Sequence, residues 1–118
     1  MKLNHINLVV KDVADATQFF ETYFNFKCIE RKGDSIIVIL KGSDDFTLAL
    51  MKAKEGAPVY PDAFHIGFML DREDRVIETY QQLKDAGIVS GQEPKKIRDS
   101  FGFYFTYQDV MIEIGHYS

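Results

Sequence analysis

The sequence predicts an α+β protein built from two tandem βαβββ modules, and three observations support this prediction. The segment HINLVV at residues 5–10 is repeated in similar form as HIGFML at residues 65–70, which begins 60 residues later. An amphipathic helical pattern follows each of these apolar segments, and three strand-like stretches follow each helical pattern. An internal repeat of this length predicts that both halves of the chain fold alike.

The first module begins with the strand at residues 5–10, and Asp12 with Asp15 then predicts a helix start. A side-chain oxygen at the first position satisfies free amide groups, and acids in the first turn suit the helix dipole. Asn25 is a residue that often ends a helix in the left-handed conformation. Phe19, Phe20 and Phe24 are expected in the core. They belong to an apolar stripe along the helix that needs an apolar surface to lie on: Ala16, Phe19, Phe20, Tyr23 and Phe24.

Three strands are then expected at residues 26–30, 35–40 and 46–51, separated by the turn sequences KGD (32–34) and GSDD (42–45). Residues 53–63 contain Gly56, Pro58 and Pro61 and are predicted to be a linker. The expected organisation is therefore one domain of residues 1–118, with modules at residues 1–52 and 64–118.

The second module repeats this order. Asp71 with Asp74 predicts the helix start, and Gly87 predicts its end. Strands are expected at residues 88–90, 101–106 and 110–114, the first with the weakest pattern. The apolar residues of this helix are Val76, Ile77, Tyr80 and Leu83, and Ile77 and Leu83 are expected in the core.

Composition excludes several classes of protein. The 118 residues include 14 Lys and Arg and 18 Asp and Glu, a formal net charge of −4, so we expect no nucleic-acid partner. The longest apolar run, residues 36–40, is far shorter than the roughly 18 residues of a membrane helix, so no membrane partner is expected. Early polar residues leave no signal-peptide core, and a single cysteine, Cys28, suits a reducing compartment. We therefore expect a cytoplasmic protein.

Period-two alternation places three chemically capable side chains on one side of the predicted sheets. In each repeat the more apolar strand face is expected under the helix, which leaves His5 and His65 on the opposite face. The same argument places Glu113 on that face, with Ile112 and Ile114 under the helix. A carboxylate in an apolar strand is costly to bury unless it is paired or bound to a metal, although a solvated edge strand would also explain it.

These segments, together with FYF at residues 103–105 and MIEI at residues 111–114, resemble the vicinal oxygen chelate superfamily. That superfamily includes glyoxalase I, fosfomycin-resistance proteins, bleomycin-resistance proteins and extradiol dioxygenases. The resemblance covers essentially the whole chain and implies a cup-shaped mixed sheet with the helices on its outer face. It also implies a homodimer, a small-molecule substrate, and a divalent ion (Zn, Ni, Mn, Fe or Co) held by His5, His65 and Glu113.

Two departures from the superfamily pattern affect the expected chemistry. Glyoxalase I has a fourth ligand, a glutamate at the end of the first module, where this chain has Ala49. A missing carboxylate weakens the proton shuttle that glyoxalase chemistry needs. The turn before the last strand reads YQDV at residues 107–110 where relatives often read DPDG, and this change leaves the ligand strand intact.

A site with two histidines and one carboxylate leaves coordination positions for two neighbouring substrate oxygens. Tyr104 and Tyr107 are candidate proton donors, and Tyr104 joins Glu113 as a candidate catalytic residue. A terminal histidine, His116, is a candidate base, with a surface role favoured. Three basic residues can meet an anionic substrate, although a solvated basic loop is the favoured explanation: Lys95, Lys96 and Arg98.

The sequence thus favours a metal-dependent, glyoxalase-like enzyme with lyase, isomerase or transferase chemistry on a small oxygen-rich substrate. One alternative is a metal-free protein that binds a drug or metabolite, as bleomycin-resistance proteins do. Another is an Fe(II) dioxygenase, which is disfavoured because only His116 remains for acid–base work.

Overall fold

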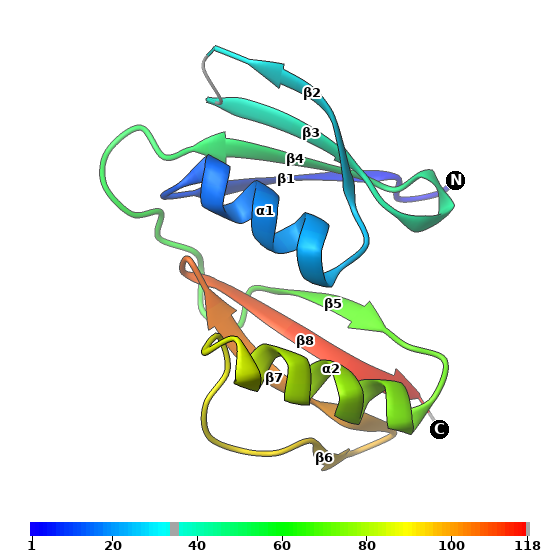
Figure 1. Cartoon of the computed structure of the whole chain (residues 1–118). Coiled ribbons are helices and arrows are strands. Elements are labelled where there is room, and N and C mark those ends of the chain that lie inside the picture. Colours follow the sequence, from blue (N-terminus) through cyan, green and yellow to red (C-terminus); the bar gives the residue numbers. More distant parts are fainter. Residues whose placement is uncertain (34–35, 118) are drawn as a thin grey trace. The chain divides into compact units, whose positions relative to one another are not determined.

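The computed structural model describes residues 1–33 and 36–117, which form two compact units, Met1–Val59 and Tyr60–Ser118 (Figure 1). Each unit is a βαβββ module with one helix and one four-stranded mixed sheet. The predicted α+β fold of two tandem modules is therefore confirmed. In the described part of the chain, neither helix is both long and apolar enough to cross a bilayer.

The first unit has its strands in the order β1-β4-β3-β2. β1 pairs with β4 in parallel, and the other neighbours are antiparallel. The turn predicted at residues 32–34 and the predicted strand start at residue 35 fall partly outside the described residues. The elements are β1 (His5–Val10), α1 (Val13–Tyr23), β2 (Lys27–Lys32), β3 (Ile37–Lys41), a 3₁₀ turn η1 (Ser43–Asp45) and β4 (Thr47–Lys52).

The second unit repeats this topology, with the strand order β5-β8-β7-β6. β5 and β8 are parallel, and β8–β7 and β7–β6 are antiparallel. The elements are β5 (His65–Met69), α2 (Glu73–Asp85), β6 (Lys95–Ile97), β7 (Ser100–Tyr107) and β8 (Val110–Tyr117).

In each unit the helix covers one face of its own sheet (Figure 1). Asp12 caps α1 as predicted, because its carboxylate accepts a hydrogen bond of 3.0 Å from the Asp15 amide. After α1 the chain turns at Asn25, whose φ of 60° is left-handed. The cores under the two helices include these buried side chains: Leu8, Val10, Phe20, Leu40, Leu50, Val76, Leu83, Ile112 and Ile114.

Two predictions about α2 are wrong. The helix begins after Arg72 rather than after Asp71, and the Arg72 side chain makes no capping hydrogen bond. Arg72 instead pairs with Asp74 at 2.9 Å. Ile77 is 52% exposed, because the helix buries only the narrow stripe that contains Val76, Tyr80 and Leu83. Gly87 follows the helix with a φ of 76°, as expected.

The predicted strand at residues 88–90 is also wrong. The amides of Ile88 and Val89 donate to the Leu83 carbonyl, at 2.9 and 3.4 Å, so this apolar segment closes the end of α2. The third strand of this sheet is instead β6 (Lys95–Ile97), which the sequence analysis treated as a basic loop. Two lysines give a three-residue edge strand almost no strand pattern.

Candidate metal and substrate site

Backbone register places Tyr104 and Glu113 side by side on the open face of the second sheet. Glu113 is the direct partner of Gly67 on β5 and of Tyr104 on β7. Directly paired residues share a sheet face, and so do alternate residues on one strand, so His65 also lies on this face. The buried Ile112 and Ile114 face α2, as the alternation predicted.

A short hydrogen bond fixes the orientation of the His65 ring. The Nδ1 atom of His65 lies 2.9 Å from the carbonyl oxygen of Ala63. A carbonyl only accepts, so Nδ1 carries the hydrogen and Nε2 of the neutral ring keeps its lone pair. Ala63 has a φ of 66°, an uncommon left-handed conformation for a residue with a side chain. This backbone conformation is part of what aims Nε2 of His65.

The His65 Nε2 atom faces the Oε1 atom of Glu113 across 3.4 Å. The Glu113 side chain is 15% exposed, and the His65 side chain is 38% exposed. A largely desolvated carboxylate needs a cationic partner or a metal ion to offset the cost of burial. Gly67 leaves room beside it, because a Cβ there would lie 3.5 Å from Oε1 of Glu113.

Tyr104 completes the cluster. Its ring meets the His65 ring edge to face, with ring centroids 5.5 Å apart. Partial burial raises the pKa of the Tyr104 phenol above its ordinary value, and the negative charge and hydrogen bond of Glu113 raise it further. Tyr104 is therefore a hydrogen-bond donor at neutral pH rather than a phenolate.

The donor atoms of this cluster fit a divalent metal ion. One imidazole nitrogen and one carboxylate oxygen are the ligands that Zn²⁺ and neighbouring transition metals accept. Two ligand atoms each about 2.1 Å from one ion are separated by roughly 3.0–3.4 Å, depending on the coordination geometry. The observed 3.4 Å between Nε2 and Oε1 is within this range. Within either unit, the described residues include no cluster of three or more His, Cys, Asp or Glu side chains that could hold a metal.

His5 occupies the corresponding position of the first unit and has a different environment. Its Nδ1 lies 2.7 Å from the Asn4 side-chain oxygen. Ala49 pairs with Asn7 as Glu113 pairs with Gly67, so Ala49 is the structural equivalent of Glu113. The structure thus brings His65, Tyr104 and Glu113 together in one sheet, whereas the first sheet has Ala49 at the position that corresponds to Glu113. Metal binding by His5, His65 and Glu113 stays a prediction.

Two other candidates lie on the helix side of the second sheet. Tyr107 pairs directly with the buried Val110, so it lies on the face opposite Tyr104. The Nδ1 atom of His116 lies 2.9 Å from the Leu70 carbonyl, which ties the end of β8 to the chain after β5. His116 is therefore a structural anchor, and the expectation that Tyr107 lies near the site is wrong.

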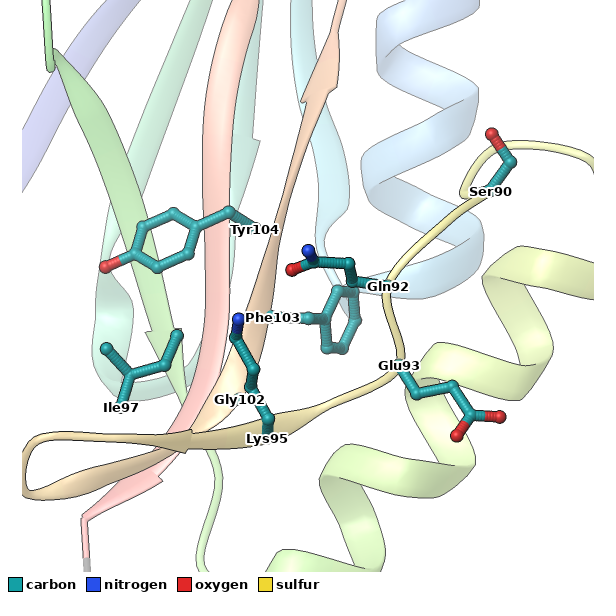
Figure 2. Close-up of a pocket in the computed structure, with 8 residues that line it drawn as sticks. All are labelled: Ser90, Gln92, Glu93, Lys95, Ile97, Gly102, Phe103 and Tyr104. Carbon is teal, nitrogen blue, oxygen red and sulfur yellow. The ribbon is translucent and has the colours of Figure 1, made fainter.

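A cavity of about 230 Å³ lies at the edge of the same sheet (Figure 2). Of the three basic candidates, only Lys95 lines it, because Lys95 pairs with Gly102 on the Tyr104 face while Lys96 pairs with Phe101 on the other. The cavity was not predictable from the strand pattern, because part of its wall at residues 90–93 was predicted as a strand. Its lining residues are Ser90, Gln92, Glu93, Lys95, Ile97, Gly102, Phe103 and Tyr104.

Two βαβββ units with a histidine–carboxylate pair on an open sheet face define the vicinal oxygen chelate class. Residues 2–113 match the family model described as the Glyoxalase/Bleomycin resistance protein/Dioxygenase superfamily, and the chain belongs to this superfamily. The resemblance seen in the sequence is thereby confirmed.

Solved structures agree with this assignment. The chain is similar to a possible glyoxalase from Bacillus cereus, with 35% identity, a TM-score of 0.81 and 97% of each chain covered. It is also similar to the fosfomycin resistance protein FosX from Listeria monocytogenes, with 20% identity, a TM-score of 0.78, and coverage of 100% of this chain and 94% of that one. A glyoxylase/bleomycin resistance protein/dioxygenase domain from Frankia sp. EAN1pec has 12% identity and a TM-score of 0.84, with 100% and 98% covered. The latter two likenesses establish the fold alone. No curated protein sequence matches the chain.

Proposed function

We propose that the protein is a divalent-metal-dependent enzyme of the vicinal oxygen chelate type that acts on a small oxygen-rich substrate. The single observation that carries the proposal is the pairing of His65 Nε2 with Glu113 Oε1 at 3.4 Å. Tyr104 lies directly beside this pair. His65 and Glu113 would hold the ion, with His5 as a third ligand from this chain or from a second copy of it.

The roles of the residues follow from their positions. A bound divalent ion would supply Lewis-acid stabilisation of negative charge on substrate oxygens. The hydrogen bond from Nδ1 of His65 to the Ala63 carbonyl leaves the lone pair of Nε2 available to a metal ion. The ring therefore needs no reorientation on metal binding. The Tyr104 hydroxyl can donate a hydrogen bond or a proton to a substrate oxygen next to Glu113. The His65 side chain is 38% exposed and Tyr104 is 43% exposed, so a small ligand can reach both groups.

The equivalence of Ala49 and Glu113 restricts the reaction. A proton shuttle between two substrate carbons uses a carboxylate base, and Ala49 provides none. Reactions that need one electrophilic centre and one proton donor, such as addition to a small electrophile, fit the site better. Assaying the hemithioacetal of methylglyoxal with glutathione or another small thiol tests the glyoxalase reaction directly.

Metal binding is tested by elemental analysis of protein purified without chelator. We expect about one equivalent of metal per chain, lost in His65→Ala and in Glu113→Ala. His116→Ala is the matched control, because that histidine lies on the helix side of the sheet and bonds to Leu70. If the wild type stays empty after incubation with Mn²⁺, Ni²⁺, Zn²⁺ or Fe²⁺, the metal-free binding function replaces this proposal.

The origin of the third ligand is tested by mixing variants. His5→Ala and His65→Ala copies are unfolded together, refolded and assayed for bound metal. If each site of a twofold dimer combines His5 of one copy with His65 of the other, about one quarter of the wild-type sites return. If both histidines come from one chain, no sites return. An unchanged metal content in His5→Ala alone would remove His5 from the ligand set.

A further inference from the structure

We propose that Met69 is a specificity-determining residue that restricts the site to compact substrates. Its side chain fills the strip of sheet face next to Glu113, into which a larger substrate would otherwise extend. This inference rests on the proposed function, because it concerns the size of the ligand whose oxygens would meet the metal. It narrows the substrate class from oxygen-rich molecules to those without a bulky group next to the metal-binding oxygens.

Strand register places Met69 on the same sheet face as the histidine–carboxylate pair. His65, Gly67 and Met69 alternate along β5, so their side-chain positions share one face. Gly67 is the direct partner of Glu113, and Met69 is the direct partner of Gly115. Since two residues of a strand span about 6.6 Å, the row that contains Met69 lies roughly that far along the sheet from the row that contains Glu113.

The Met69 side chain bridges two glycines beside Glu113. A Cβ built on Gly67 would lie 3.6 Å from Cε of Met69 and 3.5 Å from Oε1 of Glu113. A Cβ built on Gly115 would lie 3.6 Å from Cε and 3.7 Å from Sδ of Met69. The terminal atoms of Met69 therefore occupy space that both glycines leave free. Met69 is 40% exposed, so a ligand that extends from Glu113 along the strands meets this thioether.

A methionine also fills the corresponding part of the first sheet, although it comes from the other strand of the pair. Met51 on β4 occupies the register position of Gly115 on β8. The side-chain amide of Asn7, the counterpart of Gly67, donates a hydrogen bond of 2.9 Å to Sδ of Met51. Filling this space is thus common to both sheets. In the second sheet the thioether of Met69 also borders a site with an imidazole and a carboxylate.

A thioether forms a boundary that a ligand can displace. Methionine has three rotatable side-chain bonds and adapts to irregular spaces. Because Met69 is partly exposed, its side chain can turn toward solvent, but it then loses its contacts over the two glycines. A bulky ligand is therefore bound more weakly rather than excluded, and the effect is measured as a ratio of dissociation constants.

Two hydroxamates of different size test this boundary. Acetohydroxamate and benzohydroxamate offer the same two neighbouring oxygens, and only benzohydroxamate carries a ring. Their dissociation constants are measured by calorimetry on the metal-loaded wild type, Met69→Ala and Met69→Leu. Ile77→Ala is the matched control, because Ile77 is a comparable apolar side chain, 52% exposed, on the helix that covers the other face of this sheet.

The preference for acetohydroxamate over benzohydroxamate is the quantity that decides. Met69→Ala should shift this preference about tenfold toward benzohydroxamate, because the ring then buries apolar surface where the thioether lay. Met69→Leu conserves the volume and should stay within about twofold of the wild type, as should Ile77→Ala. An unchanged preference in Met69→Ala, even with a lower Tm, would show that Met69 only fills space and would overturn the inference. An equal shift in Ile77→Ala would overturn it as well.

A failure of the proposed function would look different, because neither hydroxamate would then bind to any of these proteins. The boundary is in that case decided on the metal-free protein with acetamide and benzamide, whose N–H groups can donate to Glu113. The ring signals of Tyr104, identified with Tyr104→Phe, are followed in NMR titrations. A response to benzamide in Met69→Ala that the wild type lacks supports the boundary. The same response in both proteins, or none in either, refutes it.

Discussion

Gly102 provides the sharpest test of how the backbone shapes the site. A Cβ added at Gly102 would collide with the Ile114 carbonyl oxygen and lie 2.8 Å from the Gly115 Cα. Both neighbours are backbone atoms of β8, so no side chain can move aside to make room. The β7 and β8 strands would have to separate next to Glu113, where the two strands pair in register.

The Gly102→Ala substitution should therefore be strongly destabilising. Overpacking costs about 1–3 kcal/mol, and a weakened pair of strand hydrogen bonds adds about 1 kcal/mol. We expect a loss of about 3 kcal/mol in the free energy of unfolding, which lowers Tm by roughly 10 °C for a chain of this size. Thermal and urea denaturation followed by circular dichroism measure both quantities.

Gly67→Ala is the matched control on the same sheet face. A Cβ at this position would contact only side-chain atoms. It would lie 3.5 Å from Oε1 of Glu113 on β8 and 3.6 Å from Cε of Met69 on β5, and both are ordinary contact distances. We expect its free energy of unfolding to change by less than about 0.5 kcal/mol. If Gly102→Ala is as stable as Gly67→Ala, the close approach of β7 and β8 is not what requires glycine.

Three other predictions follow from the backbone and the charges. Replacing the Gln108–Asp109 turn, in which both residues have positive φ, with Asn-Gly should raise Tm by about 3–8 °C in calorimetry; an unchanged Tm would show that the turn is not strained. Ala63→Gly relaxes the segment that holds His65 and should weaken Co²⁺ binding about tenfold in spectroscopic titrations, with little change in Tm; undiminished Co²⁺ affinity would contradict this. Because partial burial and the Glu113 charge raise the pKa of Tyr104, the phenol favours the folded state below about pH 10, and this contribution is lost as the pH rises through the folded-state pKa. The Tyr104 signal is isolated in an ultraviolet titration by subtracting the curve of the matching Tyr104→Phe variant. Glu113→Gln should lower the pKa of Tyr104, and an unchanged pKa would exclude Glu113 as a cause.

Much of the fold could be predicted from the sequence because its main signals are periodic and repeated. Alternation identified the buried faces of β1 and β8, and a capping carboxylate identified the start of α1. The errors fall where a local pattern has two physical explanations. Apolar residues at 88–90 suit a strand, but here they close a helix, with the amides of Ile88 and Val89 bonded to Leu83. β6 was not predicted because two of its three residues are Lys95 and Lys96, so this edge strand has no alternation of apolar and polar residues.

The candidate site was predictable only as far as strand faces determine it. Alternation was enough to place Glu113 and His65 on one face. Alternation gave no information on the left-handed backbone of Ala63. The orientation of the His65 imidazole depends on a hydrogen bond to the backbone carbonyl of this residue and not on a neighbouring side chain. Tyr107 was misassigned because the predicted strand ended at residue 106, whereas β7 extends to Tyr107 and alternation then places this residue opposite Tyr104.

The internal repeat also shows how the two halves have diverged. Ile39 and Ala49 are direct partners in the first sheet, as Tyr104 and Glu113 are in the second. The first half has therefore kept the histidine of the pattern, but at the positions of the phenol and the carboxylate it has apolar side chains. Among the described residues, the carboxylate, phenol and imidazole of this pattern occur together only in the second sheet. Because Ala49 stands where Glu113 has its counterpart in the first sheet, the metal content of Glu113→Ala should fall to zero rather than to half.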